Sequence, residues 1–239
     1  MEQQNKVAVI TGATGGIGAA VAQALSQAGY RLVLGGRSEQ KLAALAARLA
    51  GESIAVAGDL REPDVPARLL AAALDRFGRC NVCLNNAGTI EVGRIEEIDI
   101  ERVCDMARLN VEATFRIAYT FLKHFARQGT GHLVNMSSVL GKKVRTTAGA
   151  YAGTKFAIEA LSEALRMELS HSQVMVSSIQ PGLVMSGLHD RWDVHPSQAM
   201  GIADPLQPED VARMVRFVLE QPAHVRIPQL MILPKDHEI

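Results

Sequence analysis

Short apolar runs alternate with helical runs along the whole chain of 239 residues, and this alternation restricts the fold more than any other feature. The strand-like runs are 6–10, 31–35, 53–57, 81–85, 132–137, 174–179 and 229–233, and the helical runs are 17–28, 39–49, 64–77, 100–127, 151–170 and 208–219. Alternation of this kind is typical of parallel strands joined by right-handed helical crossovers. We therefore predict an α/β fold of three layers, with a doubly wound parallel sheet of about seven strands and helices on both faces.

Composition and charge exclude several other classes of protein. Hydrophobic residues make up 48% of the chain and the formal net charge is zero, so neither a basic stripe nor an acidic tail suggests a nucleic acid or another charged partner. No apolar stretch reaches the roughly 18 residues of a membrane-spanning helix. The first six residues lack the basic region and apolar core of a signal peptide. We expect a cytoplasmic protein that has no nucleic-acid or membrane partner.

No linker, charge block or repeat divides the chain, so residues 1–239 are interpreted as one domain. The long irregular segment 183–207 is the exception to the regular pattern, and long loops in compact domains are usually lids or binding segments. We expect it to form a substrate lid hinged at Gly187 and Gly201. An apolar wall over the substrate would come from Leu183, Met185, Leu188, Trp192 and Met200.

The cysteines and histidines indicate no metal site. Three cysteines are too few and too irregular for a disulfide framework. Cys80 and Cys83 are spaced as Cys-x-x-Cys, but Cys83 lies in an apparent strand and no second ligand pair follows. His189 and His195 fall in the irregular segment, where a surface position is the first interpretation and substrate contact the second.

A glycine-rich turn follows the first strand-like run. Residues 7–10 lead into Thr11-Gly12-Ala13-Thr14-Gly15-Gly16-Ile17-Gly18, and a helical run begins there. Glycines let a backbone approach a pyrophosphate, and a helix N-terminus offers free N–H groups and the positive end of its dipole. Because a strand precedes the turn and a helix follows it, we interpret the turn as a dinucleotide site rather than as a simple tight turn.

Tyr151 and Lys155 are four residues apart in Tyr-Ala-Gly-Thr-Lys, and Ser138 lies thirteen positions before the tyrosine. On a helix, positions four apart share one face, so the phenol and the ammonium group would point the same way. A nearby cation lowers the pKa of a phenol from its usual value of about 10, which would suit a general acid or base. The alternative is a buried tyrosine beside a surface lysine.

Together these motifs resemble those of the short-chain dehydrogenase/reductase family, in its compact single-domain branch of Rossmann-type fold. The glycine pattern, Asp59-Leu60, Asn85-Asn86-Ala87-Gly88, Asn110 and Pro181-Gly182 stand in the family's order, with Ser138, Tyr151 and Lys155. The resemblance implies the catalytic residues Asn110, Ser138, Tyr151 and Lys155. The resemblance, supplemented by Arg37 after the second strand, also implies which residues bind the cofactor. These are Thr11, Gly12, Thr14, Gly15, Gly16, Ile17, Gly18, Arg37, Asp59, Leu60, Asn86, Ala87, Gly88, Tyr151, Lys155, Pro181, Gly182, Val184 and Ser186.

The resemblance also implies a role for each catalytic residue. Tyr151 would protonate a carbonyl oxygen as hydride arrives, or deprotonate an alcohol in the reverse direction, while Ser138 would bind that oxygen. Lys155 would lower the pKa of the tyrosine and hold the nicotinamide ribose. Asn110 would bind a water molecule that links Lys155 to solvent. The alternative for Asn110 is an asparagine that kinks or caps the helix; asparagine is disfavoured inside helices, which agrees with a special local role.

The residues after the second strand favour NADP(H) over NAD(H). An NAD site places a carboxylate there to bind the ribose 2′-hydroxyl group. Here Leu34-Gly35-Gly36-Arg37-Ser38 has no carboxylate, and Arg37 could pair with a 2′-phosphate.

Two local features bear on the class of substrate. The C-terminal run 226–234 and the Gly36-Arg37 pair resemble NADP-dependent hydroxy-acid and serine dehydrogenases, so a small hydroxy acid or related ketone is one possibility. The three cations of 142–145 could attract a carboxylate or could form a solvated loop.

Two further expectations concern activity and association. The alternative to an enzyme is a non-catalytic NADP(H)-binding regulatory or scaffold protein on the same fold, but such a protein would be expected to lack part of the catalytic set. The resemblance implies a homodimer or homotetramer formed through the runs 100–127 and 151–170.

Overall fold

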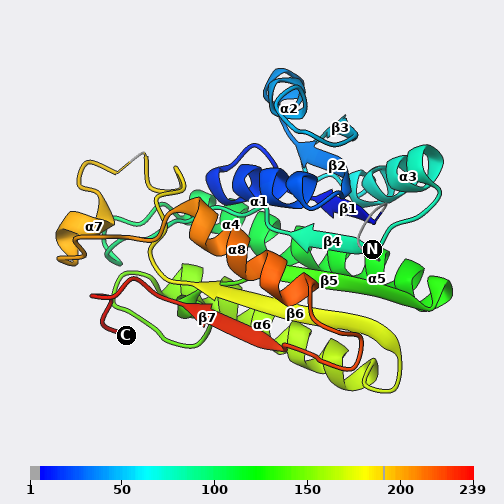
Figure 1. Ribbon diagram of the computed structural model, residues 1–239. Helices are drawn as coiled ribbons and strands as arrows, with labels where there is room; N and C mark the ends of the chain where they lie inside the picture. Colours follow the sequence, from blue (N-terminus) through cyan, green and yellow to red (C-terminus); the bar gives the residue numbers. More distant parts are fainter. Residues whose placement is uncertain (1–5, 191) are drawn as a thin grey trace.

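The computed structural model describes residues 6–190 and 192–239. Its centre is a parallel sheet of seven strands in the order β3-β2-β1-β4-β5-β6-β7 (Figure 1). The strands are β1 (Val7–Ile10), β2 (Arg31–Gly36), β3 (Ser53–Ala57), β4 (Val82–Asn85), β5 (Thr130–Met136), β6 (Gln173–Pro181) and β7 (Gln229–Ile232). The doubly wound parallel sheet predicted from the alternating runs is confirmed.

The sheet changes winding direction at β1. This strand pairs with β2 on one side, where Val9 lies opposite Val33, and with β4 on the other, where Val9 lies opposite Cys83. Successive strands are added outward from β1 in one direction as far as β3 and in the other as far as β7. In open α/β sheets, ligands bind outside the carboxyl ends of the strands at such a switch point. The glycine-rich turn begins at this point.

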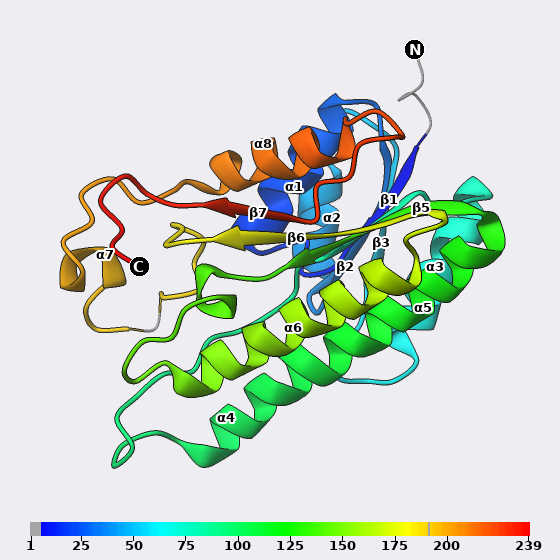
Figure 2. The ribbon, with the colours of Figure 1, turned by 90° about the horizontal axis from the view of Figure 1, so that it is seen from below.

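Helices cover both faces of the sheet (Figure 2). One face carries α1 (Gly16–Gln27), α2 (Glu39–Ala46) and α8 (Pro208–Leu219). The other carries α3 (Val65–Phe77), α5 (Thr114–Gln128) and α6 (Gly149–Glu168). In none of the helices of 6–190 and 192–239 is there an apolar stretch long enough to cross a membrane.

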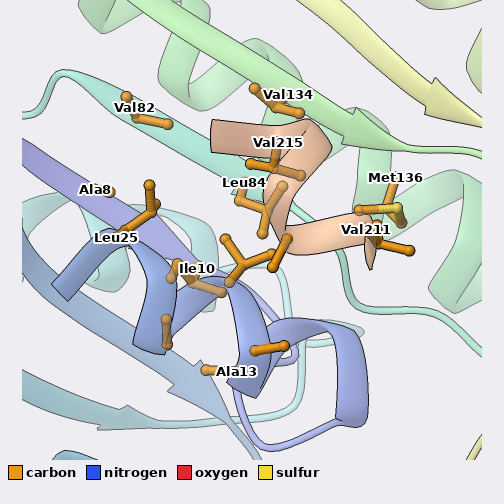
Figure 3. Close-up of a cluster of buried hydrophobic side chains, with 14 of the residues drawn as sticks. Ala8, Ile10, Ala13, Leu25, Val82, Leu84, Val134, Met136, Val211 and Val215 are labelled. Carbon is orange, nitrogen blue, oxygen red and sulfur yellow. The ribbon is translucent and has the colours of Figure 1, made fainter. Parts of the chain in front are cut away.

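Alternate side chains of each central strand enter opposite cores, as the two-residue period of a strand requires. In β1, Ala8 and Ile10 join the core beneath α1 and α8, whereas Val7 and Val9 join the core beneath α3 and α5. Figure 3 shows the first of these cores, where Leu25 of α1 and Val215 of α8 lie over the residues of β1 and β4. Burial on both faces explains why β1 is apolar without interruption.

The expected helix 100–127 contains a π-helical turn. It comprises α4 (Ile100–Ala107), the π-helix η1 (Arg108–Ala113) and α5. Asn110 lies in η1, and its side chain bonds to residue 89 outside the helix. π-turns inside α-helices are frequent at functional sites. The 3₁₀ helix η2 (Val139–Gly141) and the short helix α7 (Pro196–Ala199) had not been expected from the sequence.

Candidate active site

Four polar side chains from three elements converge on the carboxyl side of β4 and β5. Asn110 comes from η1, Ser138 caps the N-terminus of η2, and Tyr151 and Lys155 lie on α6. Their exposed fractions are 1%, 8%, 7% and 5%, respectively, so all four are buried. The structure brings together the four residues that the resemblance implied.

The side-chain amide of Asn110 forms hydrogen bonds through both its oxygen and its nitrogen. Its Oδ1 accepts a hydrogen bond from the N–H of Thr89 (2.9 Å), and its Nδ2 donates to the carbonyl of Thr89 (2.8 Å) and to Thr154 Oγ1 (3.2 Å). Thr154 Oγ1 in turn donates to the carbonyl of Tyr151 at 2.7 Å. A Cβ added at Gly88 would lie 3.2 Å from Asn110 Oδ1 and 3.8 Å from Lys155 Nζ. The π-helix is thereby fixed to the N-terminal part of α6 through Thr154.

Burial dominates the electrostatics of the tyrosine and the lysine. It raises the pKa of Tyr151 to about 12, and a hydrogen bond with Ser138 opposes part of that rise. It lowers the pKa of Lys155 to about 8, and the Glu159 carboxylate opposes that fall. Lys155 Nζ lies 5.7 Å from the centre of the Tyr151 ring and donates to the carbonyl of Met136 at 2.9 Å. The pKa of Tyr151 is therefore raised by desolvation, not lowered as expected from the nearby lysine, and the group that opposes the rise is Ser138.

Backbone contact at the switch point depends on glycine. Gly12 has φ of +62°, and a Cβ there would lie 2.9 Å from Ala87 Cα. A Cβ at Gly18 would lie 2.2 Å from the carbonyl oxygen of Gly12. Thr11 Oγ1 connects the loop after β1 to the loop after β4, because it accepts hydrogen bonds from the N–H groups of Asn86 (2.9 Å) and Ala87 (3.1 Å). The loop after β1 and the loop after β4 therefore form one surface.

The N-terminus of α1 faces this surface without a side-chain cap. Its N-cap residue is Gly15, which offers no side chain to the first turn. The N–H of Gly16 donates to the carbonyl of Ser186 at 3.3 Å, so the segment after β6 lies against the start of the helix. Uncapped N–H groups at a helix N-terminus suit a phosphate. The glycine turn thus fits the pyrophosphate of a dinucleotide.

The sequence model of the family described as short chain dehydrogenase matches residues 6–195. The chain belongs to this family. An uncharacterized oxidoreductase of Staphylococcus epidermidis is 33% identical to this short-chain dehydrogenase over 231 residues, which are 97% of this chain and 98% of the relative.

Two solved structures resemble this chain over nearly its whole length. The alcohol dehydrogenase of the archaeon Thermococcus sibiricus, complexed with 5-hydroxy-NADP, has a TM-score of 0.85 and 29% identity, and the match covers 98% of each chain. The closed form of a serine dehydrogenase complexed with NADP⁺ has a TM-score of 0.90 and 25% identity over 98% of this chain and 96% of the other. Relatives of this short-chain dehydrogenase are named oxidoreductases, which confirms the expected class of enzyme.

A second group of charges lies at the far end of the predicted cofactor site. Arg61 forms a bidentate ion pair with Asp59, in which Nε donates to Oδ1 at 3.0 Å and Nη2 donates to Oδ2 at 2.6 Å. The hydrogen bond from Arg61 is the main reason why the pKa of Asp59 falls to about 2, and the charge of the exposed Arg37 contributes. The sequence predicts Asp59 as a cofactor residue but does not predict its pairing with Arg61.

Several predicted cofactor residues have their side chains inside the protein. Leu60 belongs to the core beneath α3, and Val184 belongs to the core beneath α1 and α8. Thr11 is fully buried. Leu60 and Val184 can therefore meet a cofactor only through the backbone, whereas the Thr11 hydroxyl organises the loops.

The ends of the segment 183–207 are joined to each other. Val184 forms a parallel bridge with Leu206, and the N–H of Met185 donates to the carbonyl of Leu206 at 2.8 Å. His189 is 9% exposed, so the first interpretation as a surface histidine is wrong. The rings of Trp192 and His195 pack on it, with centres 4.9 Å and 5.7 Å away, and this packing removes it from solvent.

The C-terminal tail also reaches this region. His237 packs against Gly182, because a Cβ at Gly182 would lie 2.5 Å from its Nδ1 atom. The Nδ1 atoms of His189 and His237 are both buried, and neither has a hydrogen-bond partner in the part of the chain that the structure describes. Burial lowers the pKa of both imidazoles, to about 4 for His189, and the charge of Arg145 adds to the effect in each.

A surface cavity of about 730 Å³ lies beside the first turn of α6. It is lined by the residues Gly93, Arg94, Ile95, Glu96, Ile98, Thr146, Thr147, Gly149 and Ala150. Thr147 has φ of +67°, and its carbonyl accepts from the N–H of Gly93. Backbone strain of this kind often accompanies functional sites.

The two cysteines of the Cys-x-x-Cys spacing are buried, free thiols in and next to β4. Burial raises the pKa of Cys80 to about 12 and raises that of Cys83 well above its ordinary value. Both thiols are therefore kept protonated and unreactive.

Three residues of the site were missed from the sequence: Thr154, Glu159 and His237. The first two had a local signal, because Thr154 lies between the tyrosine and the lysine and Glu159 lies four positions after Lys155. His237 had none, since only the folding of the tail places it beside Gly182.

Proposed function

We propose that this short-chain dehydrogenase is an NADP(H)-dependent oxidoreductase that interconverts a carbonyl group and a secondary alcohol, with a small hydroxy acid or related ketone as substrate. The observation that carries the proposal is the burial of Tyr151 together with Ser138, to which it is hydrogen-bonded, and Lys155, whose Nζ lies 5.7 Å from the centre of its ring. Buried groups with displaced pKa values, next to a phosphate-type cradle, are typical of catalytic acids and bases.

Tyr151 is the proton donor and acceptor of this proposal. With a pKa of about 12 its hydroxyl is protonated at neutral pH, so it can donate to a carbonyl oxygen in the reductive direction. The hydroxyl of Ser138 binds and orients the same oxygen. Lys155 is mainly charged at neutral pH, since its pKa is about 8, and its field stabilises negative charge that develops on the phenol.

The cofactor is held by the surface described above. The uncapped start of α1 takes the pyrophosphate, while Asn86, Ala87 and Gly88 form the wall opposite it. The nicotinamide supplies or accepts the hydride when it is bound. Lys155 retains donors for the ribose, because Met136 takes one of the three N–H groups of its ammonium.

NADP(H) is proposed over NAD(H) because the position after β2 carries Arg37 and no carboxylate. Both solved relatives described above hold NADP-type ligands. Arg61 is a second cation at this end of the site, although Asp59 neutralises it.

The proposed acidic substrate is supported by positive charge near Pro181-Gly182. Arg145 contacts Met200 of the segment 183–207, and its charge acts on both His189 and His237. A substrate carboxylate would favour the protonated form of these two imidazoles, whose Nδ1 atoms have no partner among the residues described. The likeness to a serine dehydrogenase is in keeping with this substrate class.

Replacing Tyr151 tests the reaction. We expect Tyr151→Phe to fold and to bind NADPH, because only one hydroxyl is lost, and to lose at least about 99% of kcat, since general acid catalysis contributes roughly 10²–10⁴-fold. The matched control is Tyr119→Phe, which removes the same hydroxyl from a tyrosine that is 46% exposed and lies outside the candidate active site, and which keeps the apolar ring. Activity is followed at the nicotinamide absorbance band with a panel of ketones and hydroxy acids. Retention of more than a few per cent of kcat in Tyr151→Phe would contradict the mechanism.

Replacing Arg37 tests the choice of cofactor. The wild-type protein should bind NADPH more tightly than NADH, and salt should reduce the difference. Arg37→Ala should weaken NADPH binding by roughly 1–3 kcal/mol with little effect on NADH, because only the phosphate contact is lost. Arg48→Ala, which removes an exposed cation just after α2, is the control. Titration calorimetry that gave equal NADPH and NADH affinities in the wild type would rule out the preference.

A further inference from the structure

A buried carboxylate that the proposed mechanism does not use lies one helical turn beyond Lys155. Glu159 is 4% exposed and occupies position i+4 from the lysine on α6. Residues four apart on a helix share a face. An acidic side chain is rarely buried this deeply unless it is paired. The contacts of Glu159 therefore indicate what it does.

Three other segments of the chain meet at the carboxylate. Its Oε2 accepts from Ser178 Oγ of β6 (3.1 Å) and from Gln229 Nε2 of β7 (3.0 Å). Lys142 Nζ, just after η2, lies 3.5 Å from the same oxygen. The other oxygen, Oε1, is buried and has no hydrogen-bond partner within the described ranges. The two neutral donors do not cancel the charge of the carboxylate, and the cation that pairs with it directly, Lys142, is partly exposed to solvent.

The loop between Ser138 and Lys142 closes tightly over this part of α6. A Cβ added at Gly141 would lie 3.0 Å from Glu159 Cγ and 3.1 Å from the carbonyl oxygen of Lys155. Such close packing leaves no solvent layer on this side of the helix turn between the two residues. Charges interact more strongly in such an environment than in water.

The lysine needs a negative charge nearby. Burial alone favours the neutral amine, and the hydrogen-bond acceptor of Nζ is the uncharged carbonyl of Met136. The carboxylate of Glu159 acts in the opposite sense and favours the ammonium form. Tyr151 faces Lys155 on α6, while Lys142 and Arg166 also face Glu159. Both of these cations are partly exposed, so solvent screens them more than it screens Lys155.

We propose that Glu159 is a positioning residue that acts through Lys155: its buried carboxylate is the counter-charge that keeps the lysine in the ammonium form at neutral pH. Glu159 does not touch substrate or cofactor in this scheme. The inference rests on the proposed role of Lys155. The competing explanation is a purely structural glutamate that ties α6 to β6 and β7.

The two explanations differ in the pH dependence of catalysis. The pKa of Lys155 is already below its ordinary value, and removal of Glu159 lowers it further. Activity requires the protonated lysine, so activity is retained below this pKa and is lost as the pH rises through it. Loss of the carboxylate must therefore displace the basic limb of kcat/KM to lower pH. A structural defect would reduce activity to a similar extent at every pH and would leave the limb in place.

The experiment compares Glu159→Gln with Glu163→Gln. Both remove one carboxylate from α6 at nearly constant volume, but Glu163 is exposed. We expect the basic limb of Glu159→Gln to move about one unit to lower pH, the size of shift that one charged neighbour produces. The loss of kcat/KM would then be about tenfold greater above the limb than at pH 6. Glu163→Gln should have the wild-type limb. Coincident limbs in the wild type and both variants would overturn the proposal.

Two further variants guard against misfolding and test rescue. Glu159→Asp retracts the charge by one methylene and should move the limb in the same direction by less. If Glu159→Gln does not fold, as judged by circular dichroism, an unmoved limb in Glu159→Asp overturns the proposal. The double variant Glu159→Gln/Gln229→Glu returns a carboxylate to the same network and should move the limb back toward its wild-type position. No return would count against an electrostatic role.

Failure of this inference can be distinguished from failure of the proposed function. Lys155→Met should abolish turnover if the lysine is catalytic, whatever Glu159 does. If Lys155→Met is inactive and the basic limb of kcat/KM in Glu159→Gln stays at its wild-type pH, only the proposed role of Glu159 is refuted. A fully active Lys155→Met would refute the proposed function itself.

Discussion

Single atoms decide the geometry of the switch point. Gly18 approaches the carbonyl of Gly12 so closely that a Cβ would lie 2.2 Å from its oxygen. The same carbonyl accepts from the N–H of Gly15 at 3.0 Å and from Asn86 Nδ2 at 3.3 Å. Displacement of this one oxygen would therefore disturb the glycine turn and the loop after β4 together.

Gly18→Ala should therefore damage both stability and cofactor binding. We expect a loss of about 1–3 kcal/mol in the free energy of unfolding, which is typical of overpacking. NADPH affinity should fall by more than about tenfold, because the N–H groups at the start of α1 move with the turn. Urea denaturation and fluorescence titration measure the two effects.

Gly153→Ala is the matched control for Gly18→Ala. A Cβ at Gly153 meets nothing within 4 Å, and the residue lies inside α6. Alanine is favoured over glycine inside a helix by roughly 0.5–1 kcal/mol, so this variant should be as stable as the wild type or slightly more stable. Equal effects of the two substitutions would show that the close contact at Gly18 has no special importance.

Elements bring residues that are distant in sequence to one place. The π-helix η1 turns Asn110 toward Thr89 and Thr154, and α6 presents Tyr151, Lys155 and Glu159 from its buried side. The segment 183–207 leaves β6 beside Gly182 and returns to pair Leu206 with Val184. Its two ends are fixed, so any opening motion must take place between them.

We predict that the middle of 183–207 closes over the bound ligands. Trp192 is half-buried against His189, and it is the only tryptophan in the chain. Its emission should shift when NADPH binds and shift again with a substrate analogue, and protease cleavage within the segment should slow in the same order. The variant Trp192→Phe is the control for emission, because it contains no tryptophan. If neither emission nor cleavage changes, the segment is a fixed structural loop.

The whole molecule leaves apolar side chains exposed on the face that carries α5 and α6. Tyr119, Phe156 and Met167 are 46%, 41% and 70% exposed, respectively. Exposed apolar side chains on these two helices favour a surface that a second copy would cover.

We predict a homodimer or homotetramer formed through these helices. Light scattering at micromolar concentration should give a mass of two or four chains. Phe156→Glu should shift the protein toward monomer, because it places a charge in the contact. Phe217→Glu alters an apolar residue that is 49% exposed on α8, across the sheet, and should leave the α5–α6 contact intact. A wild-type protein that is only monomeric would refute this prediction.

The presence of about seven parallel strands, the glycine turn and the Tyr151–Lys155 spacing were predictable from the sequence alone, whereas the order of the strands in the sheet came from the structure. Each depends on local pattern: apolar runs give strands, and a fixed spacing on a helix gives a shared face. The motif of residues 85–88 lies opposite the glycine turn for a similar reason, since parallel strands end at the same edge of a sheet.

Tertiary structure alone decided how strongly each group is buried and what lies beside it. Packing of Trp192 and His195 buries His189, Arg61 occupies the carboxylate of Asp59, and Ser178 and Gln229 enclose Glu159. Desolvation and charge partners set a pKa, and both depend on segments far away in the sequence. For that reason the sequence identified the tyrosine and the lysine, whereas only the folded chain showed that burial raises the pKa of one and lowers that of the other.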